Sequence, residues 1–136
     1  MSDIPVSILD GASKVFKNLG GGLYAELGAV ISLSEMPTNS TPLTGTASAS
    51  TVVGPFTPQL ARDIILTLSG TWTGAVVVKR SVDGGTTKLP LTVGGSSWGS
   101  YAANCQEPVW LETEAGATYY LDITIATGTL AYRMAQ

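Results

Sequence analysis

Three glutamates that lie close together in the sequence are the first residues whose types and spacing could do chemistry. They are Glu107, Glu112 and Glu114, and the last two stand two residues apart, which on a strand means the same face. Two carboxyl groups flanking a glycosidic bond can hydrolyse it by acid and base catalysis. Glu112 and Glu114, however, stand beside Gly116 at an expected strand end, where solvated charges are ordinary. We therefore expect surface carboxylates, no catalytic residues and no enzyme.

Aromatic side chains offer a second kind of chemistry, the binding of sugar rings. The apolar face of a sugar lies well on an indole, so Trp72, Trp98, Trp110 and Tyr101 could form a platform. Trp110 stands between two aliphatic residues, as is typical of a core position. Trp72 and Trp98 are flanked by glycine, serine and threonine, which indicates loops. These two tryptophans are therefore the candidate carbohydrate contacts.

Several kinds of reactive centre are excluded because the sequence has no histidine and a single cysteine, Cys105. One chain cannot build an intramolecular disulfide, a Cys–His metal site or a Ser-His-Asp triad. The aspartates Asp63, Asp83 and Asp122 lack the spacing of a calcium loop. Cys105 has no base beside it, so we expect a buried, unreactive thiol. We predict neither a metal nor a cofactor.

Charged residues are scarce. They make up 12% of the chain, about half the roughly 25% of an ordinary soluble domain. With seven basic residues and a net charge of −3, no patch could neutralise a run of phosphates, so we expect no nucleic-acid partner. Apolar runs fall far short of the about 18–20 residues of a membrane span, so we expect no membrane partner. The first residues lack a signal-peptide pattern, which indicates synthesis in a cytosol. Because charge keeps monomers apart, we expect burial in an assembly, with a neutral monomer as the alternative.

One turn carries a recognisable side-chain pattern. Residues 81–87, Ser-Val-Asp-Gly-Gly-Thr-Thr, resemble the Asp-box hairpin of sialidase-type propellers, with Lys88 where that motif has tryptophan. The carboxylate in such a hairpin accepts backbone N–H bonds across the reversal, so we expect Asp83 to be structural. A propeller needs several blades, and a single copy cannot make one.

Alternation of apolar and polar residues predicts that strands dominate the chain. The spacing of the strands predicts an all-β fold, an antiparallel β-sandwich or barrel. Residues 70–74 are expected to connect two strands, and residues 126–128 to turn between the last two. The expected strands cover residues 62–69, 75–82, 87–92, 100–104, 108–113, 118–126 and 129–134. The expected core contains Leu66, Leu68, Val76, Val78, Leu121, Ile123 and Ile125.

Composition divides the chain into three parts. Residues 1–34 are expected to form an extended N-terminal arm of short β elements, residues 35–53 an extended linker, and residues 54–136 the β domain. An edge strand over residues 44–53 is the alternative for the end of the linker. The arm is too short to bury its own apolar side chains, which must find another surface. The candidate partner contacts are therefore Val6, Ile8, Leu9, Phe16, Leu23, Tyr24 and Leu27.

Five short segments of the expected β domain form a recognisable combination. They are Gly-Pro-Phe-Thr-Pro at 54–58, Leu-Ser-Gly-Thr-Trp-Thr-Gly at 68–74, Val-Lys-Arg-Ser-Val-Asp-Gly-Gly at 78–85, Glu-Pro-Val-Trp at 107–110 and Tyr-Arg-Met at 132–134. Together they resemble a domain of tailed-bacteriophage virion proteins, which are small and rich in β structure. The resemblance covers residues 54–136 and includes no catalytic motif.

The resemblance implies a non-enzymatic structural protein, present in repeated copies on a virion after synthesis in the host bacterial cytoplasm. The expected role is a capsid decoration or cement protein, a homotrimer that binds the major capsid protein and stabilises the shell. A tail or head–tail connector protein is one alternative. A carbohydrate-binding module on the virion surface, using Trp72 and Trp98, is the alternative from a different functional class.

Overall fold

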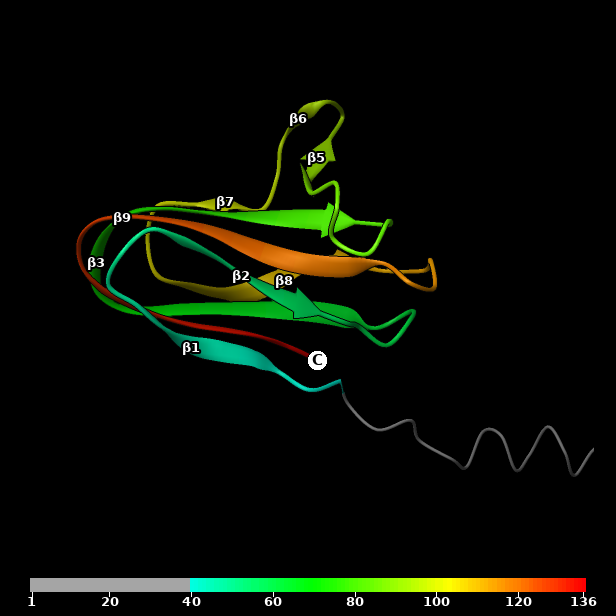
Figure 1. Cartoon of the computed structure of the whole chain (residues 1–136), viewed down its shortest axis with the longest axis horizontal. Coiled ribbons are helices and arrows are strands. Elements are labelled where there is room, and N and C mark those ends of the chain that lie inside the picture. Colours follow the sequence, from blue (N-terminus) through cyan, green and yellow to red (C-terminus); the bar gives the residue numbers. More distant parts are fainter. Residues whose placement is uncertain (1–39) are drawn as a thin grey trace, which may run out of the picture. The chain divides into compact units, whose positions relative to one another are not determined.

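The computed structural model describes residues 40–136, and this part of the chain folds into antiparallel β-strands (Figure 1). The all-β prediction is confirmed. No helix in the described range is long and apolar enough to cross a membrane. The strands are β1 (Leu43–Ala47), β2 (Thr51–Phe56), β3 (Asp63–Ser81), β4 (Leu89–Pro90), β5 (Thr92–Val93), β6 (Ser96–Ser97), β7 (Ser100–Tyr101), β8 (Cys105–Leu111) and β9 (Thr118–Ala135).

The two longest strands, β3 and β9, are the central pair of the sheet. They pair from Ile65 opposite Ala135 to Ser81 opposite Thr118, with one register shift after Thr73. The prediction that residues 70–74 and 126–128 interrupt these strands is therefore wrong. Both strands continue through these residues, and the whole ribbon bends there (Figure 1).

Glycines allow this bend because two strands approach each other too closely for side chains. Gly74 has φ +145° and Gly128 has φ +83°, conformations that other residues rarely adopt. A Cβ atom on Gly74 would collide with the carbonyl oxygen of Thr124, and one on Gly128 with that of Thr71. The glycine-rich segments of the sequence thus mark a bend within strands and not the ends of strands.

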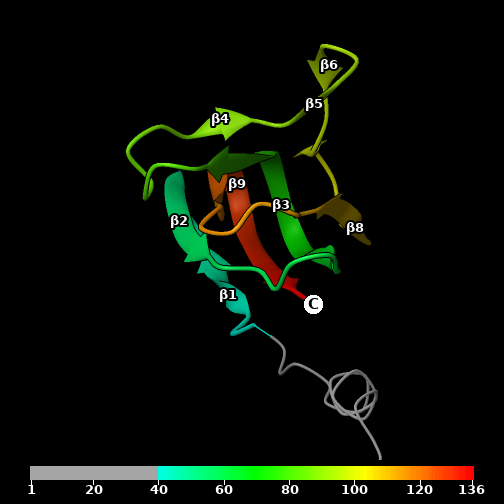
Figure 2. The ribbon, with the colours of Figure 1, turned by 90° about the vertical axis from the view of Figure 1, so that its right-hand side faces the viewer.

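The bend folds the sheet into two facing layers (Figures 1 and 2). One layer contains β1, the C-terminal half of β9, the N-terminal half of β3, and β8. The other contains β2, the remaining halves of β9 and β3, and the short strands β4 and β7. β1 and β2 lie on one side of the domain and β8 on the opposite side, while the β5–β6 hairpin projects from the body (Figure 2).

The core lies between the layers and contains the side chains that alternation predicted. Leu66, Leu68, Val76, Val78, Leu121 and Ile123 are buried, whereas Ile125, next to the bend, is partly buried against them. Each fully buried apolar side chain contributes roughly 1.5–3 kcal/mol to the stability of the folded state. Further large buried side chains are Phe56, Ile64, Tyr119, Leu130 and Met134.

The end of the expected linker is part of the sheet. β1 and β2 both pair with β9, and residues 40–136 belong to one compact unit. The alternative of an edge strand over residues 44–53 fits this arrangement, although the chain forms two strands there. β9 is long enough to accept one strand along each half. The expected arm, residues 1–34, lies outside the described residues.

Candidate functional site

Glu112 belongs to a salt-bridge cluster in which Arg80 is its main partner. Arg80 of β3 donates from Nε to Glu112 Oε1 at 2.6 Å and from Nη2 to Oε2 at 2.9 Å. The hydroxyl of Tyr119 on β9 donates to Oε1, and the backbone N–H groups of Thr113 and Glu114 donate to Oε2. Glu112 is 2% exposed. The expectation of a solvated carboxylate is therefore wrong for this residue.

The electrostatics of this cluster are those of a structural ion pair. The Arg80 guanidinium is the main reason why the pKa of Glu112 falls to about 2, against the opposing effect of burial. Burial, and secondly Glu112, raise the pKa of the Tyr119 hydroxyl. Glu112 is thus ionised near neutral pH and cannot act as a general acid. Glu114, whose side chain is 60% exposed, accepts one bond from Arg80 at 2.9 Å.

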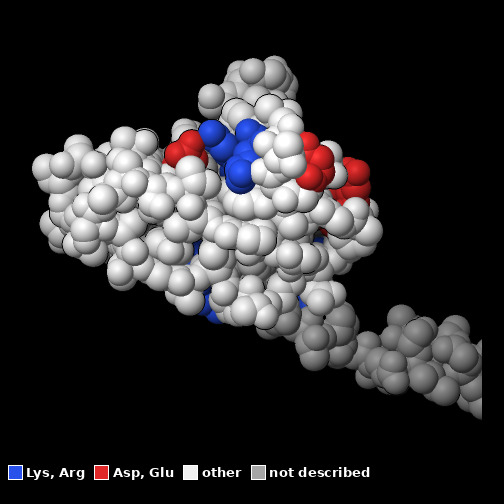
Figure 3. Space-filling view, in the orientation of Figure 1, with Lys and Arg blue, Asp and Glu red and all other residues white. Residues whose placement is uncertain are grey.

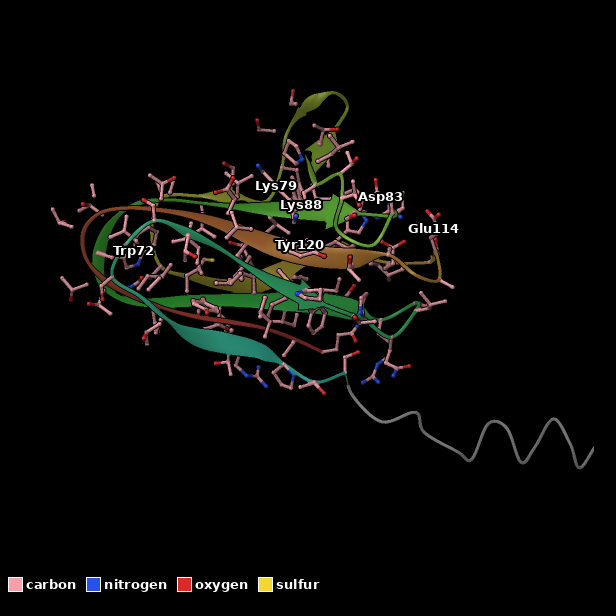
Figure 4. The ribbon with its side chains drawn as sticks, in the orientation of Figure 1. Trp72, Lys79, Asp83, Lys88, Glu114 and Tyr120 are labelled. Atoms are coloured by element: carbon pink, nitrogen blue, oxygen red, sulfur yellow. The ribbon has the colours of Figure 1, made fainter. Side chains whose placement is uncertain are left out.

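The Asp83 turn has the hydrogen bonds that the sequence pattern predicts. The backbone N–H of Thr87 and the hydroxyl of Ser81 each donate to Asp83 Oδ1 at 2.8 Å, and Gly85 N–H donates to Ser81 Oγ at 2.8 Å. The bond from Thr87 is the main cause that lowers the pKa of Asp83 to about 2. Lys88 donates to the Gly85 carbonyl and lies over the ring of Tyr120 (Figure 4). Asp83 therefore closes the turn.

The structure does not combine Trp72 and Trp98 into one platform. Trp72 lies at the bend, where its Nε1 donates to Asn104 Oδ1 at 2.8 Å and its ring packs against the core (Figure 4). Asn104 in turn donates to the Gly70 carbonyl at 3.0 Å, so Trp72 stabilises the bend. Trp110, expected in the core, is partly buried against it.

Trp98 lines a hollow of about 180 Å³ on the β8 side of the domain, together with Tyr101, Glu107, Ser97 and Ser100. Tyr101 pairs with buried Val76 and Glu107 with buried Leu66, and opposite residues of an antiparallel pair point to the same face. The two side chains therefore point inward from outer strands of the two layers, β7 and β8. They meet at the open side of the domain.

The sequence does not predict that Tyr101 and Glu107 are neighbours, because their proximity depends on the register in which β7 and β8 each pair with β3. Neither the Glu107 carboxylate nor the Tyr101 hydroxyl makes a hydrogen bond or ion pair within residues 40–136. Burial, and then the charge of Glu107, raise the pKa of Tyr101 to about 12. Burial likewise raises the pKa of Cys105, which is partly exposed where a buried thiol was expected.

The surface carries little charge and several exposed apolar side chains. In Figure 3 charged residues gather along one part of the visible face, and the face over the bend is uncharged. Beside the Asp83 turn, a mostly apolar hollow of about 280 Å³ is lined by Val82, Leu89, Leu91 and Trp110, with Arg80 at its wall. The exposed large apolar residues are Val52, Leu60, Val82, Leu89, Val93, Trp98 and Leu111.

The outer edge of β1 is open among the described residues. β1 pairs only with β9, in an uninterrupted register, and contains neither proline nor charge. β2, the neighbouring edge strand, contains Pro55 and a register shift, which are features that hinder pairing with another chain.

Residues 40–136 contain no group of three or more Cys, Asp or Glu side chains placed to hold a metal ion. The candidate partner contacts of the arm lie outside the described residues. Comparison of the chain with protein families, curated proteins and solved structures found no match.

Proposed function

We propose that this chain is a non-enzymatic structural component of a bacteriophage virion, a decoration protein that binds across subunits of the capsid. Such a protein acts by contact area, so it needs a stable body, an uncharged surface and a means of joining other subunits. The resemblance of residues 54–136 to virion proteins is the sequence argument for this role. The contacts of Glu112 also support a non-enzymatic role, because this carboxylate is held in a salt bridge that stabilises the fold.

The observation that carries the proposal is the edge of β1, which no other strand of residues 40–136 covers. A strand edge without lysine, proline or a bulge is a template for a strand from another chain. β1 is such an edge over five residues, and it directly follows the N-terminal segment of the sequence. A strand supplied by a neighbouring subunit would continue the layer through main-chain hydrogen bonds.

The arm is the second contact in this proposal. Its apolar side chains, such as Ile8, Phe16 and Leu27, would bind a neighbouring copy or the major capsid protein. Burying several of them at about 1.5–3 kcal/mol each could offset the conformational entropy lost when the arm is ordered on its partner. A homotrimer is the expected assembly. A tail or connector protein would use the same contacts at another place on the particle.

The direct test is to locate the protein on purified virions, by mass spectrometry and by imaging of the phage whose genome carries this sequence. The proposal expects repeated copies on the capsid, whereas copies at the tail or neck would favour the alternative. Absence of the chain from purified virions would overturn both.

A second test separates the two contacts by particle binding. We expect that deletion of residues 2–34, and the edge-blocking variant Thr46→Lys, each reduce co-sedimentation with particles that lack the protein. Thr124→Lys places the same charge at an exposed position of the central strand β9 and is the matched control. Equal binding by all these forms would contradict the proposed contacts.

A further inference from the structure

The hollow beside Trp98 gathers polar groups that the fold itself does not use. The Glu107 carboxylate and the Tyr101 hydroxyl converge there without hydrogen-bond partners among residues 40–136, and the hydroxyls of Ser97 and Ser100 lie at the same hollow. Tyr101 is partly buried, and Glu107, Ser97 and Ser100 are exposed. All four residues line the hollow, where a ligand can reach their polar groups.

The indole of Trp98 is held in a fixed position at this hollow. Its Nε1 donates to the Val109 carbonyl of β8 at 2.8 Å, and its backbone N–H donates to the Leu91 carbonyl at 3.0 Å. The next residue, Gly99, accepts a bond from Val78 N–H at 2.8 Å. Trp98 is nevertheless 43% exposed. A rigid, exposed ring loses little conformational entropy when a ligand binds on it.

The chemistry of these groups matches a sugar better than a cation. Serine and tyrosine hydroxyls both donate and accept hydrogen bonds, and a carboxylate accepts them from two directions. Sugar hydroxyls do both as well, so each group at the hollow has a complement. An ammonium or guanidinium group only donates, and it would leave the protons of the Ser97, Ser100 and Tyr101 hydroxyls unmatched.

We propose that this hollow binds one ring of a neutral carbohydrate. The apolar face of the sugar stacks on Trp98, Glu107 accepts hydrogen bonds from its hydroxyls, and Tyr101 closes the inner end. Trp72 takes no part, since it lies at the bend and bonds to Asn104. The site lies on the β8 side, opposite β1 and β2 (Figure 2), so a sugar and a strand partner at β1 could be bound together.

The test is an NMR titration of the full chain labelled with nitrogen-15. The probes are the methyl glycosides of glucose, galactose, mannose and N-acetylglucosamine, each up to about 50 mM. The Trp98 Nε1–H resonance is identified as the indole signal that is missing in Trp98→Ala. We expect at least one glycoside to shift this signal along a saturable curve.

Three variants locate the binding. Trp98→Ala and Glu107→Gln should each weaken it at least about tenfold, and Trp72→Ala should leave it within about twofold of the original protein. Glu107→Gln tests the site even if Trp98→Ala fails to fold, because Glu107 is exposed. The proposal is overturned if no glycoside gives a saturable shift, or if tetramethylammonium shifts the signal and the glycosides do not. It is also overturned if Trp72→Ala alone abolishes binding while its other amide signals keep their original positions.

Discussion

Glu107 and Glu112 stand five residues apart, on β8 and just beyond its end, and they have opposite fates. The Glu112 carboxylate receives hydrogen bonds from Arg80, Tyr119 and two backbone N–H groups. The Glu107 carboxylate receives none within residues 40–136. Both are glutamates, one within a strand and one directly after the same strand, so residue type alone cannot distinguish them.

The difference between the two regions lies in what surrounds each carboxylate. Glu112 directly follows β8, where the C-terminal half of β3 supplies a cation and the start of β9 supplies a hydroxyl, so its charge is compensated and buried. Glu107 points into the open side between the layers, where it lines a hollow together with Trp98, Tyr101 and two serines. A carboxylate whose hydrogen-bond partners lie within the protein stabilises the fold. A carboxylate without such partners is available to a ligand.

The sharpest way to break this comparison is to remove each carboxylate in turn. Glu112→Ala leaves Arg80 and the Tyr119 hydroxyl without their partner, and we expect a loss of about 3–5 kcal/mol in the free energy of unfolding. Urea denaturation followed by circular dichroism measures it. Glu114→Ala is the matched control, because its side chain is mostly exposed and should cost less than about 1 kcal/mol. Equal losses would show that Glu112 has no special role.

Acid should remove the contribution of Glu112 to the stability of the fold. The folded-state pKa of Glu112 is about 2, below its ordinary 4.5, so its contribution to stability is complete above pH 4.5 and is lost as the pH falls toward 2. The pKa of Asp83 is also about 2 and has the same sign. We expect the free energy of unfolding to decline over this range. Glu112→Gln should show a shallower decline, and an unchanged slope would contradict the assignment.

The Tyr119 hydroxyl tests one bond of the cluster. Tyr119→Phe keeps the buried ring and removes only the donor to Glu112, so we expect a loss of about 1–2 kcal/mol by the same denaturation measurement. Tyr101→Phe is the matched control, since the Tyr101 hydroxyl has no partner within residues 40–136 and should change stability by less than about 0.5 kcal/mol.

Glu107 should give the smallest effect on stability. Glu107→Gln removes a charge that no described residue pairs with, and we expect a change within about 0.5 kcal/mol. Chemical denaturation of the variant beside the original protein measures it. A loss above about 1 kcal/mol would mean that Glu107 is structural like Glu112, and the distinction between the two regions would fail.

Local patterns predicted much of this fold. Alternation placed Leu66, Val78 and Ile123 in the core because the side-chain period of a strand is two residues, whatever its neighbours are. The turn at residues 81–87 was equally readable, because Ser81 and Asp83 bond to backbone groups within six residues of each other. Composition alone also excluded histidine-dependent catalytic and metal sites within one chain, because the sequence has no histidine, and the low charge argued against a nucleic-acid partner.

What depends on contacts between distant residues was decided only by the tertiary structure. The local preference of the glycines within residues 70–74 is to end a strand. Because β3 pairs with β9 on both sides of these residues, the strand continues through them and bends there. β1 and β2 became strands because β9 offers each an edge. The same holds for the glutamates: the register of β8 and the position of Arg80, 32 residues from Glu112, determine which carboxylate is buried and which is open.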